Sequence, residues 1–253
     1  MDFLSTMDTT VRRWLYSPNS DPGEPDCEID EYFNRWMVAL MKANALLDVG
    51  GVIVDRSVLT AHFSCVSGRC APQPERGRLR SCCADLDLPL TPGERFRLKR
   101  YGRVLKETVG RFEPRLAGLV ADHQRTPNTF WSDADGYLRR PKQRCVFSAI
   151  DVQGRIRCHL YAVSRMLGVA ITDLQPISCR LFPLVLVNLR RGRVLLTVLN
   201  RRNHKLWQAP TPNRFPCLSD PTLPPLVQSM SSTLDWLFGK SFARTLKRAR
   251  LQL

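Results

Sequence analysis

Nine cysteines, several of them beside polar segments rich in Gly, Pro and Arg, constrain this 253-residue chain more than any other feature of its sequence. A single buried cysteine behaves as a small hydrophobic residue. A cysteine beside such a polar segment has little reason to lie in the core, so its thiol is available for other chemistry. We therefore expect thiols that are distant in the sequence to converge on a bound metal ion. The nine are Cys27, Cys65, Cys70, Cys82, Cys83, Cys145, Cys158, Cys179 and Cys217.

Thiolates are soft ligands, and this decides which metals the cysteines favour. A closed site of four thiolates suits zinc, and iron–sulfur clusters are also held by cysteine. No Cys-x-x-Cys pair occurs in the chain, which excludes the zinc-ribbon, thioredoxin and ferredoxin motifs. Arginines next to several cysteines are expected to lower the thiol pKa and so to favour the thiolate form. These arginines are Arg69, Arg80, Arg144, Arg157 and Arg180.

The overall composition is that of a folded globular protein, since 43% of the residues are hydrophobic and 24% are charged. No apolar run approaches the roughly 20 residues that a membrane-spanning helix needs. The N-terminal segment has no basic stretch followed by an apolar one, so we expect no secretory signal there. We therefore expect a soluble, cytoplasmic protein. In that reducing compartment, the cysteines would not form a disulfide framework.

The chain is strongly basic, with 38 Lys and Arg against 23 Asp and Glu, and its formal net charge is +15. A positive surface attracts phosphate backbones whatever their sequence, so a nucleic acid or another acidic partner is one hypothesis. The alternative is a solvated arginine-rich surface without a partner. The chain has no recognition-helix or zinc-finger motif that would favour the nucleic-acid hypothesis over this alternative. The segment 242–251 places its apolar residues on one helical face with a basic back, which equally fits a helix packed on the core.

Apolar periodicity and the positions of Gly and Pro predict the elements in the first half of the chain. Thr91 is the predicted N-cap of a helix that has Pro92 in its first turn. The predicted elements are an N-terminal arm (1–27), a helix (28 to about 48, ended by Gly50-Gly51), short strands (52–54 and 58–59), an exposed loop (71–81) and two helical stretches (93–109 and 113–124).

A β-hairpin is predicted over residues 145–158, with a turn at Asp151–Gly154. In such a hairpin, Cys145 and Cys158 fall nearly opposite each other. Cross-strand neighbours have Cβ atoms about 5 Å apart, which is within reach of one metal ion. The sequence therefore predicts that these two thiols act together.

The second half of the chain completes an α+β pattern. We expect a single compact domain over residues 28–253, with several helices and short antiparallel β-hairpins around a cysteine cluster, and not the alternating βα units of a parallel sheet. The remaining predicted elements are a helix (159–169, stopped at Gly168), a second hairpin (184–199, turning at 190–193) and C-terminal helices (221–250).

The order of the cysteine-containing blocks over residues 50–225 is distinctive. These blocks are Phe63-Ser-Cys65-x4-Cys70, Cys82-Cys83, Cys145-Val-Phe-x3-Asp151-x2-Gly154-x3-Cys158, Gln175-Pro-Ile-Ser-Cys179-Arg-Leu-Phe-Pro183, Leu199-Asn200 and Cys217. This order resembles that of the YkgJ-type zinc- or iron-chelating proteins and of a related bacterial family of unknown function. The gap between Cys70 and Cys82 is longer here than in that family, so residues 71–81 would have to loop out.

The resemblance implies that the protein binds zinc or iron, an iron–sulfur cluster included. Cys27 matches no block and is interpreted as a spare thiol. The metal ligands that the resemblance implies are Cys65, Cys70, Cys82, Cys83, Cys145, Cys158, Cys179 and Cys217.

Two other functions remain open. A relative of this family, the flagellin lysine methylase, suggests by analogy an iron–sulfur-dependent enzyme with methyltransferase-like chemistry. The net charge instead suggests a basic, nucleic-acid-associated protein. The chain has no nucleophile elbow, HExxH motif or glycine-rich phosphate loop, so no catalytic residue is assigned. His62 is the best candidate for a ligand other than cysteine, and His159 is a second.

Overall fold

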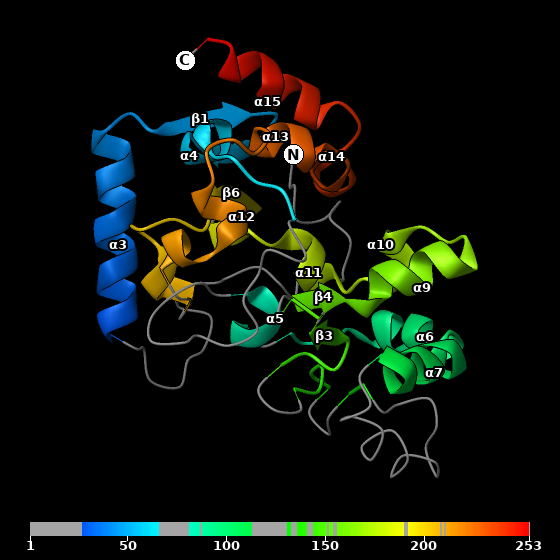
Figure 1. Cartoon of the computed structure of the whole chain (residues 1–253). Coiled ribbons are helices and arrows are strands. Elements are labelled where there is room, and N and C mark those ends of the chain that lie inside the picture. The colour runs from blue at the N-terminus through cyan, green and yellow to red at the C-terminus, as the bar shows by residue number, and fades with distance from the viewer. Residues whose placement is uncertain are drawn as a thin grey trace. The chain divides into compact units, whose positions relative to one another are not determined.

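Helices combine with a four-stranded mixed sheet and a separate two-stranded hairpin in the computed structural model of the chain (Figure 1), which confirms the α+β class. The chain divides into two compact units, residues 1–65 with 181–253, and residues 66–180. That residues 28–253 form one domain stays a prediction. The described residues are 27–65, 81–86, 88–112, 131–132, 136–140, 144–150, 152–153, 156–189, 192–207, 209 and 211–252.

The first unit begins with helix α3 (Cys27–Lys42). The predicted end of this helix near residue 48 is wrong. The chain leaves the helix after Lys42, and Asn44 adopts a φ of 47°, a left-handed conformation that Asn tolerates better than most residues. The next residues form strand β1 (Leu46–Val49), so their apolar character belongs to a sheet and not to a longer helix.

Strand β1 forms an antiparallel hairpin with strand β2 (Val52–Asp55), which confirms the strand predicted at 52–54. The turn consists of Gly50 and Gly51, whose φ values are 62° and 90°. Two successive residues with positive φ match the right-handed twist of the flanking strands, and glycine adopts this conformation without steric cost. The glycine pair is therefore a hairpin turn and not the predicted helix end.

The hairpin predicted at residues 184–199 lies in this unit and is confirmed as strands β5 (Leu184–Leu189) and β6 (Arg193–Val198). Strand β2 runs parallel to β6, so the sheet has the order β1-β2-β6-β5 and is mixed. The hairpins are antiparallel as predicted, and the parallel pairing joins one hairpin to the other. β2 and β6 are the central strands and are almost wholly buried, which explains their nearly continuous apolar sequences.

The strand predicted at residues 58–59 is wrong, because these residues lie in the short helix α4 (Ser57–Thr60). Asp55 Oδ1 accepts the backbone N–H of Ser57 at 2.9 Å. Such a local side-chain bond turns the chain where β2 ends. Val58 and Leu59 are fully buried, so the apolar pair marks the core and not a strand.

Helices are present where the sequence predicts C-terminal helices. Helix α15 contacts α4, α13, α14 and β1, all within the first unit. Among the residues that the structure describes, no helix is long and apolar enough to cross a membrane. The remaining elements of this unit are η5 (His204–Trp207), η6 (Pro212–Arg214), α12 (Pro216–Ser219), α13 (Leu226–Ser229), α14 (Ser231–Phe238) and α15 (Phe242–Arg250).

One apolar stripe of α3 packs against the sheet of the first unit. Three of the residues in this stripe have the i, i+3, i+7 spacing that puts them on one helical face. The buried residues of this core are Phe33, Trp36, Leu40, Ile53, Val187, Leu195 and Leu206.

The second unit contains the short hairpin and the helices around it. The boundary between the two units falls within α11. The elements of the second unit are α5 (Cys82–Asp85), α6 (Pro92–Arg100), α7 (Gly102–Phe112), β3 (Ser148–Ile150), β4 (Ile156–Cys158), α9 (His159–Leu167), α10 (Ile171–Leu174) and α11 (Ile177–Leu181).

Helix α6 begins as the sequence predicts, with Thr91 as the N-cap. Thr91 and Glu94 form a capping box, in which each side chain bonds to the backbone N–H of the other residue. The helix predicted over 93–109 is interrupted at Tyr101, which separates α6 from α7. Helix α9 ends at Gly168 with a φ of 64°, as predicted.

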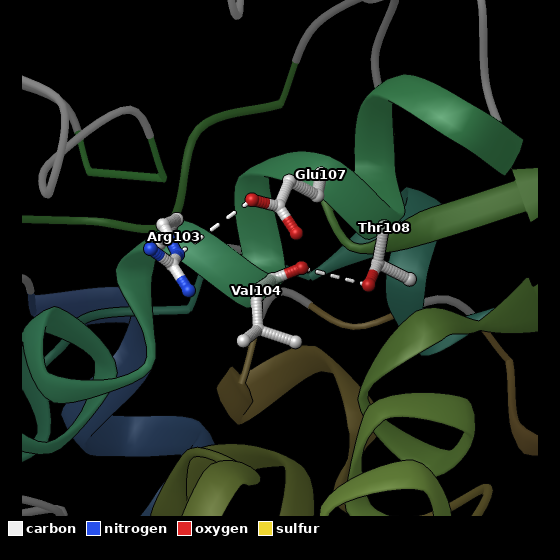
Figure 2. Close-up of polar contacts among 4 residues, drawn as sticks. All are labelled: Arg103, Val104, Glu107 and Thr108. Atoms are coloured by element: carbon white, nitrogen blue, oxygen red, sulfur yellow. Dashed lines mark hydrogen bonds and ion pairs between the residues drawn. The ribbon is translucent and has the colours of Figure 1, made fainter.

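Helix α7 has an exposed side and a buried side, and Figure 2 shows one polar contact on each. On the exposed face, Arg103 and Glu107 form an ion pair of 3.7 Å one turn apart. On the other face, the buried Thr108 donates its hydroxyl to the carbonyl of Val104 at 2.7 Å, so the helix itself satisfies this polar group. Helix α9 contacts α7.

Several predicted elements lie outside the described residues. These are the N-terminal arm apart from Cys27, the loop 71–81 apart from Ser81, the helical stretch 113–124 and the turn residues Asp151 and Gly154.

Candidate metal centre

Four cysteines from four segments pack against the hydrophobic core of the second unit. Cys145 is a buried member of this core, with 7% of its surface exposed, and Cys83, Cys158 and Cys179 are partly buried against it. They come from α5, from the residues before β3, from the end of β4 and from α11. All four lie in or against one common core, including Cys83, which the sequence places beside a polar loop.

Backbone hydrogen bonds hold three of these segments together. Cys145 donates its N–H to the carbonyl of Cys83 at 2.8 Å. Ser148 donates both its N–H and its hydroxyl to the carbonyl of Cys145, at 2.9 and 2.6 Å. Ser148 also pairs with Cys158 across the hairpin. The predicted register is therefore corrected, since Cys158 faces Ser148 and not Cys145, because the strand begins only at Ser148.

The thiols act on one another electrostatically. A hydrogen bond with the Cys82 side chain, and then burial, raise the pKa of Cys83 well above its ordinary value. Burial is the main cause that raises the pKa of Cys179. The charges of the same three thiols, Cys82, Cys145 and Cys158, raise both pKa values further. Cys82 therefore joins the other four, and we call these five residues the thiol cluster.

Burial raises the pKa of Cys145 to about 12 from an ordinary value of 9.0. A hydrogen bond with the Phe147 backbone and the charge of Arg140 lower this pKa, but burial outweighs them. The expectation that neighbouring arginines depress the thiol pKa is therefore wrong for Cys83, Cys145 and Cys179. Their thiols are protonated at neutral pH, so metal binding has to release protons.

The donor chemistry of the thiol cluster suits a soft metal ion, and it offers more thiols than the four of a closed zinc site or of one iron–sulfur cluster. Within the described ranges, no group of three or more His, Cys, Asp or Glu side chains is arranged so that it could hold a metal ion. The thiols are thus gathered without forming a finished coordination shell. Binding a metal would require these thiols to move closer together as well as to lose protons.

The buried carboxylate of Glu94 anchors the segment that carries Cys179. Its Oε1 atom accepts the backbone N–H of Ile177, and its Oε2 atom accepts the N–H and hydroxyl of Thr91, each at 2.8 Å. Ile177 is the first residue of α11, and Cys179 follows in the same helix. The sequence predicts Thr91 as the N-cap, but the role of Glu94 was not predicted, although the Thr-x-x-Glu spacing is the signal of a capping box.

Two further predicted ligands lie in the first unit, near a stack of aromatic rings. Phe182 packs on Phe63 and Phe215, with ring centroids 6.2 and 5.3 Å apart. The exposed Cys65 and the buried Cys217 each follow one of the outer rings by two residues. The stack therefore holds both segments in place, and their role as metal ligands stays a prediction.

The remaining candidate ligands are Cys70 and two histidines, His62 and His159. Cys70 lies outside the described residues. His62 lies in the first unit, with Nδ1 2.6 Å from the carbonyl oxygen of Leu223, so one ring nitrogen is engaged with the backbone. His159 is buried at the start of α9, and its backbone N–H donates to the carbonyl of Phe147 at 2.8 Å. The bond of His62 gives one of its ring nitrogens a structural partner, whereas the bond of His159 involves only its backbone, so a ligand role for either ring stays a prediction.

Comparison with protein-family models, with curated proteins and with solved structures finds no match to this chain. The candidate site therefore rests on the residues themselves and on their arrangement.

Proposed function

We propose that this protein binds zinc or iron, an iron–sulfur cluster included, through thiolates of the thiol cluster. The single observation that carries this proposal is the gathering of cysteines from four segments against one core in the second unit. The backbone bonds through Cys83, Cys145 and Ser148 fix three of these segments relative to one another. The resemblance of the cysteine order to that of YkgJ-type proteins supports the same conclusion.

A bound cation explains why so many thiols share one place. Each thiolate in the cluster would repel the others, as the pKa values of Cys83 and Cys179 show. A metal ion replaces this repulsion by attraction, and its binding free energy stabilises the folded form. Zinc in such a site would stabilise the fold, whereas an iron–sulfur cluster would supply electron transfer.

Individual residues have distinct roles in the proposed metal site. Cys145 and Cys83 are the thiols whose segments are joined directly by a backbone bond. Glu94 holds the helix that carries Cys179. Arg140 supplies a positive charge near Cys145, which offsets part of the negative charge of several thiolates. Cys65, Cys70 and Cys217 are proposed as ligands on the resemblance alone.

We also place the protein in the cytoplasm, whose reducing conditions keep thiols available for metals. Among the described residues after helix α3 there are seven cysteines, and all seven are free thiols. This observation supports the proposal, since disulfide formation would remove the ligands.

Metal analysis of the full chain, purified without oxygen, tests the proposal. We expect about one zinc or iron-containing centre per folded chain, and a visible absorption band if the centre is an iron–sulfur cluster. Cys145→Ser and Cys179→Ser should each lower the metal content severalfold. Cys27→Ser is the matched control and should retain the metal. A folded parent protein with no more metal than a denatured sample would overturn the proposal.

A further inference from the structure

Helix α15 buries its apolar face and leaves its other face in solvent. Phe242, Ala243 and Leu246 are buried, at the side where α15 contacts α4, α13, α14 and β1. The N-terminal end of α15 is fixed by Asp235 on α14, whose Oδ1 atom accepts the backbone N–H of Ala243 at 2.8 Å. The outer face of this helix is therefore held firmly in one orientation.

The outer face carries only positive charge. Arg244, Lys247 and Arg248 are exposed and follow the i, i+3, i+4 spacing of one helical stripe. Lys240 is exposed just before the helix, and the half-buried Arg250 lies at its end. We call these five residues the basic face.

The neighbouring elements do not neutralise the basic face. The elements packed against α15 contribute two carboxylates, Asp48 on β1 and Asp235 on α14. Asp48 accepts the backbone N–H of Gly51 at 2.9 Å, and Asp235 accepts that of Ala243. Throughout the part of the chain that the structure describes, no ion pair involves a residue of the basic face.

Helix stability explains only part of this charge. Cations in the last turn of a helix interact favourably with its dipole, which accounts for Lys247, Arg248 and Arg250. Lys240 and Arg244 lie at the N-terminal end, where the dipole disfavours cations. The charge at both ends of the helix therefore indicates a partner with negative charge.

We infer that the basic face binds the sugar–phosphate backbone of a nucleic acid without reading its sequence. The stripe from Arg244 to Arg248 extends about 6 Å along the helix axis, and arginine forks match phosphate oxygens. A membrane surface fits less well, because an interfacial helix inserts its apolar face, and here Phe242 and Leu246 are buried in the protein. The inference does not depend on the thiol cluster, none of whose residues lies in the basic face.

Fluorescence anisotropy with a labelled DNA duplex of mixed sequence tests this inference on the full chain. The logarithm of the binding constant should fall linearly with the logarithm of the salt concentration, with a slope of about −3 to −5 for this number of cations. The triple variant Arg244→Gln, Lys247→Gln, Arg248→Gln should bind about tenfold or more weakly at low salt. Its slope should be flatter by about 3, because three phosphate contacts are lost.

The matched control is the triple variant Arg201→Gln, Arg202→Gln, Lys205→Gln. It removes the same charge from exposed residues of the same unit and should keep the parent affinity and slope. Equal weakening in both triple variants would show diffuse attraction by the net charge and would overturn the inference. Tighter binding to vesicles of anionic lipid than to DNA, lost in the α15 variant, would overturn it in favour of a membrane. Unchanged melting temperatures of both variants show that the loss is not due to unfolding.

Discussion

A single buried carboxylate, that of Glu94, joins the start of α6 to the start of α11. One of its oxygens satisfies the N-cap residue Thr91, and the other satisfies Ile177, which is distant in the sequence. Only 2% of the residue is exposed, so water cannot replace these bonds. Burial of a carboxylate is costly unless it is hydrogen-bonded, and here every bond donor belongs to an element boundary.

Glu94→Ala should therefore lower the free energy of unfolding by about 3 kcal/mol, because buried backbone donors on two helices lose their acceptor. Thr91→Ala is the matched control. It removes the cap but keeps the bond to Ile177, and it should cost about 1 kcal/mol. Urea denaturation of the metal-free proteins measures both values, and equal losses in the two variants would contradict this role of Glu94.

The raised thiol pKa values predict how stability depends on pH in the metal-free, reduced protein. Burial raises the pKa of Cys145 to about 12, whereas the unfolded chain releases this proton near 9.0. Between these two values the folded form retains a proton that the unfolded form has lost. The thiol's contribution is thus complete below pH 9 and is lost as the pH rises, by about 1.4 kcal/mol per pH unit for one such thiol.

Urea denaturation at several pH values between 9 and 11 measures this slope. Other groups also titrate in this range, so the informative quantity is the difference from the variant Cys145→Ala. The variant should lose stability less steeply than the parent. Parallel curves for the two proteins would show that Cys145 is not buried as the structure places it.

At the level of elements, two glycines differ in whether the backbone requires them: Gly51 in the turn between β1 and β2, and Gly110 in helix α7. Gly51 has a φ of 90°, and an added Cβ atom would meet nothing within 4 Å, so only backbone strain opposes a substitution. Gly110 lies in α7, and its added Cβ atom would also meet nothing within 4 Å.

Gly51→Ala should therefore lower the free energy of unfolding by about 1 kcal/mol or more, because alanine is strained at this φ. Gly110→Ala should raise it by about 0.5–1 kcal/mol, since alanine is the better helix former. Thermal or urea denaturation of the two variants checks the prediction. A stabilising Gly51→Ala would mean that the hairpin turn differs from the one described.

The sequence predicts the existence of most elements better than it predicts their ends and pairings. The hairpin over 184–199 carries a strong alternating signal and is found as expected. The end of α3 and the strand at 58–59 are mispredicted, because Asn44 and Asp55 turn the chain through local backbone conformation that an apolar pattern does not contain. The register of the 145–158 hairpin is also missed, since it depends on the bonds of Ser148.

For the whole molecule, the sequence predicts that cysteines carry the proposed site, but it does not predict how these cysteines are divided between the two units. The five residues of the thiol cluster all lie in the unit formed by residues 66–180, whereas Cys65 and Cys217 lie in the other. A linear order of cysteines contains no information about which of them share a core. Burial, which reverses the expected direction of the pKa values, is likewise a property of the folded chain.

The two proposals also concern different units of the molecule. The thiol cluster belongs to the second unit, and the basic face belongs to the first. The proposed metal centre and the proposed phosphate-binding surface can be tested separately, because the α15 variant leaves every cysteine unchanged. We expect the cysteine variants to lose metal binding but retain DNA binding, and the α15 variant to do the reverse.

The central claim is that thiols of the second unit share one metal, and X-ray absorption at the zinc or iron edge tests it most directly. The full chain is purified without oxygen and measured with its native metal. We expect a first shell dominated by sulfur at about 2.3 Å, and in the remaining metal that Cys145→Ser binds, one sulfur replaced by a lighter ligand. A first shell of nitrogen and oxygen alone, unchanged in that variant, would contradict it.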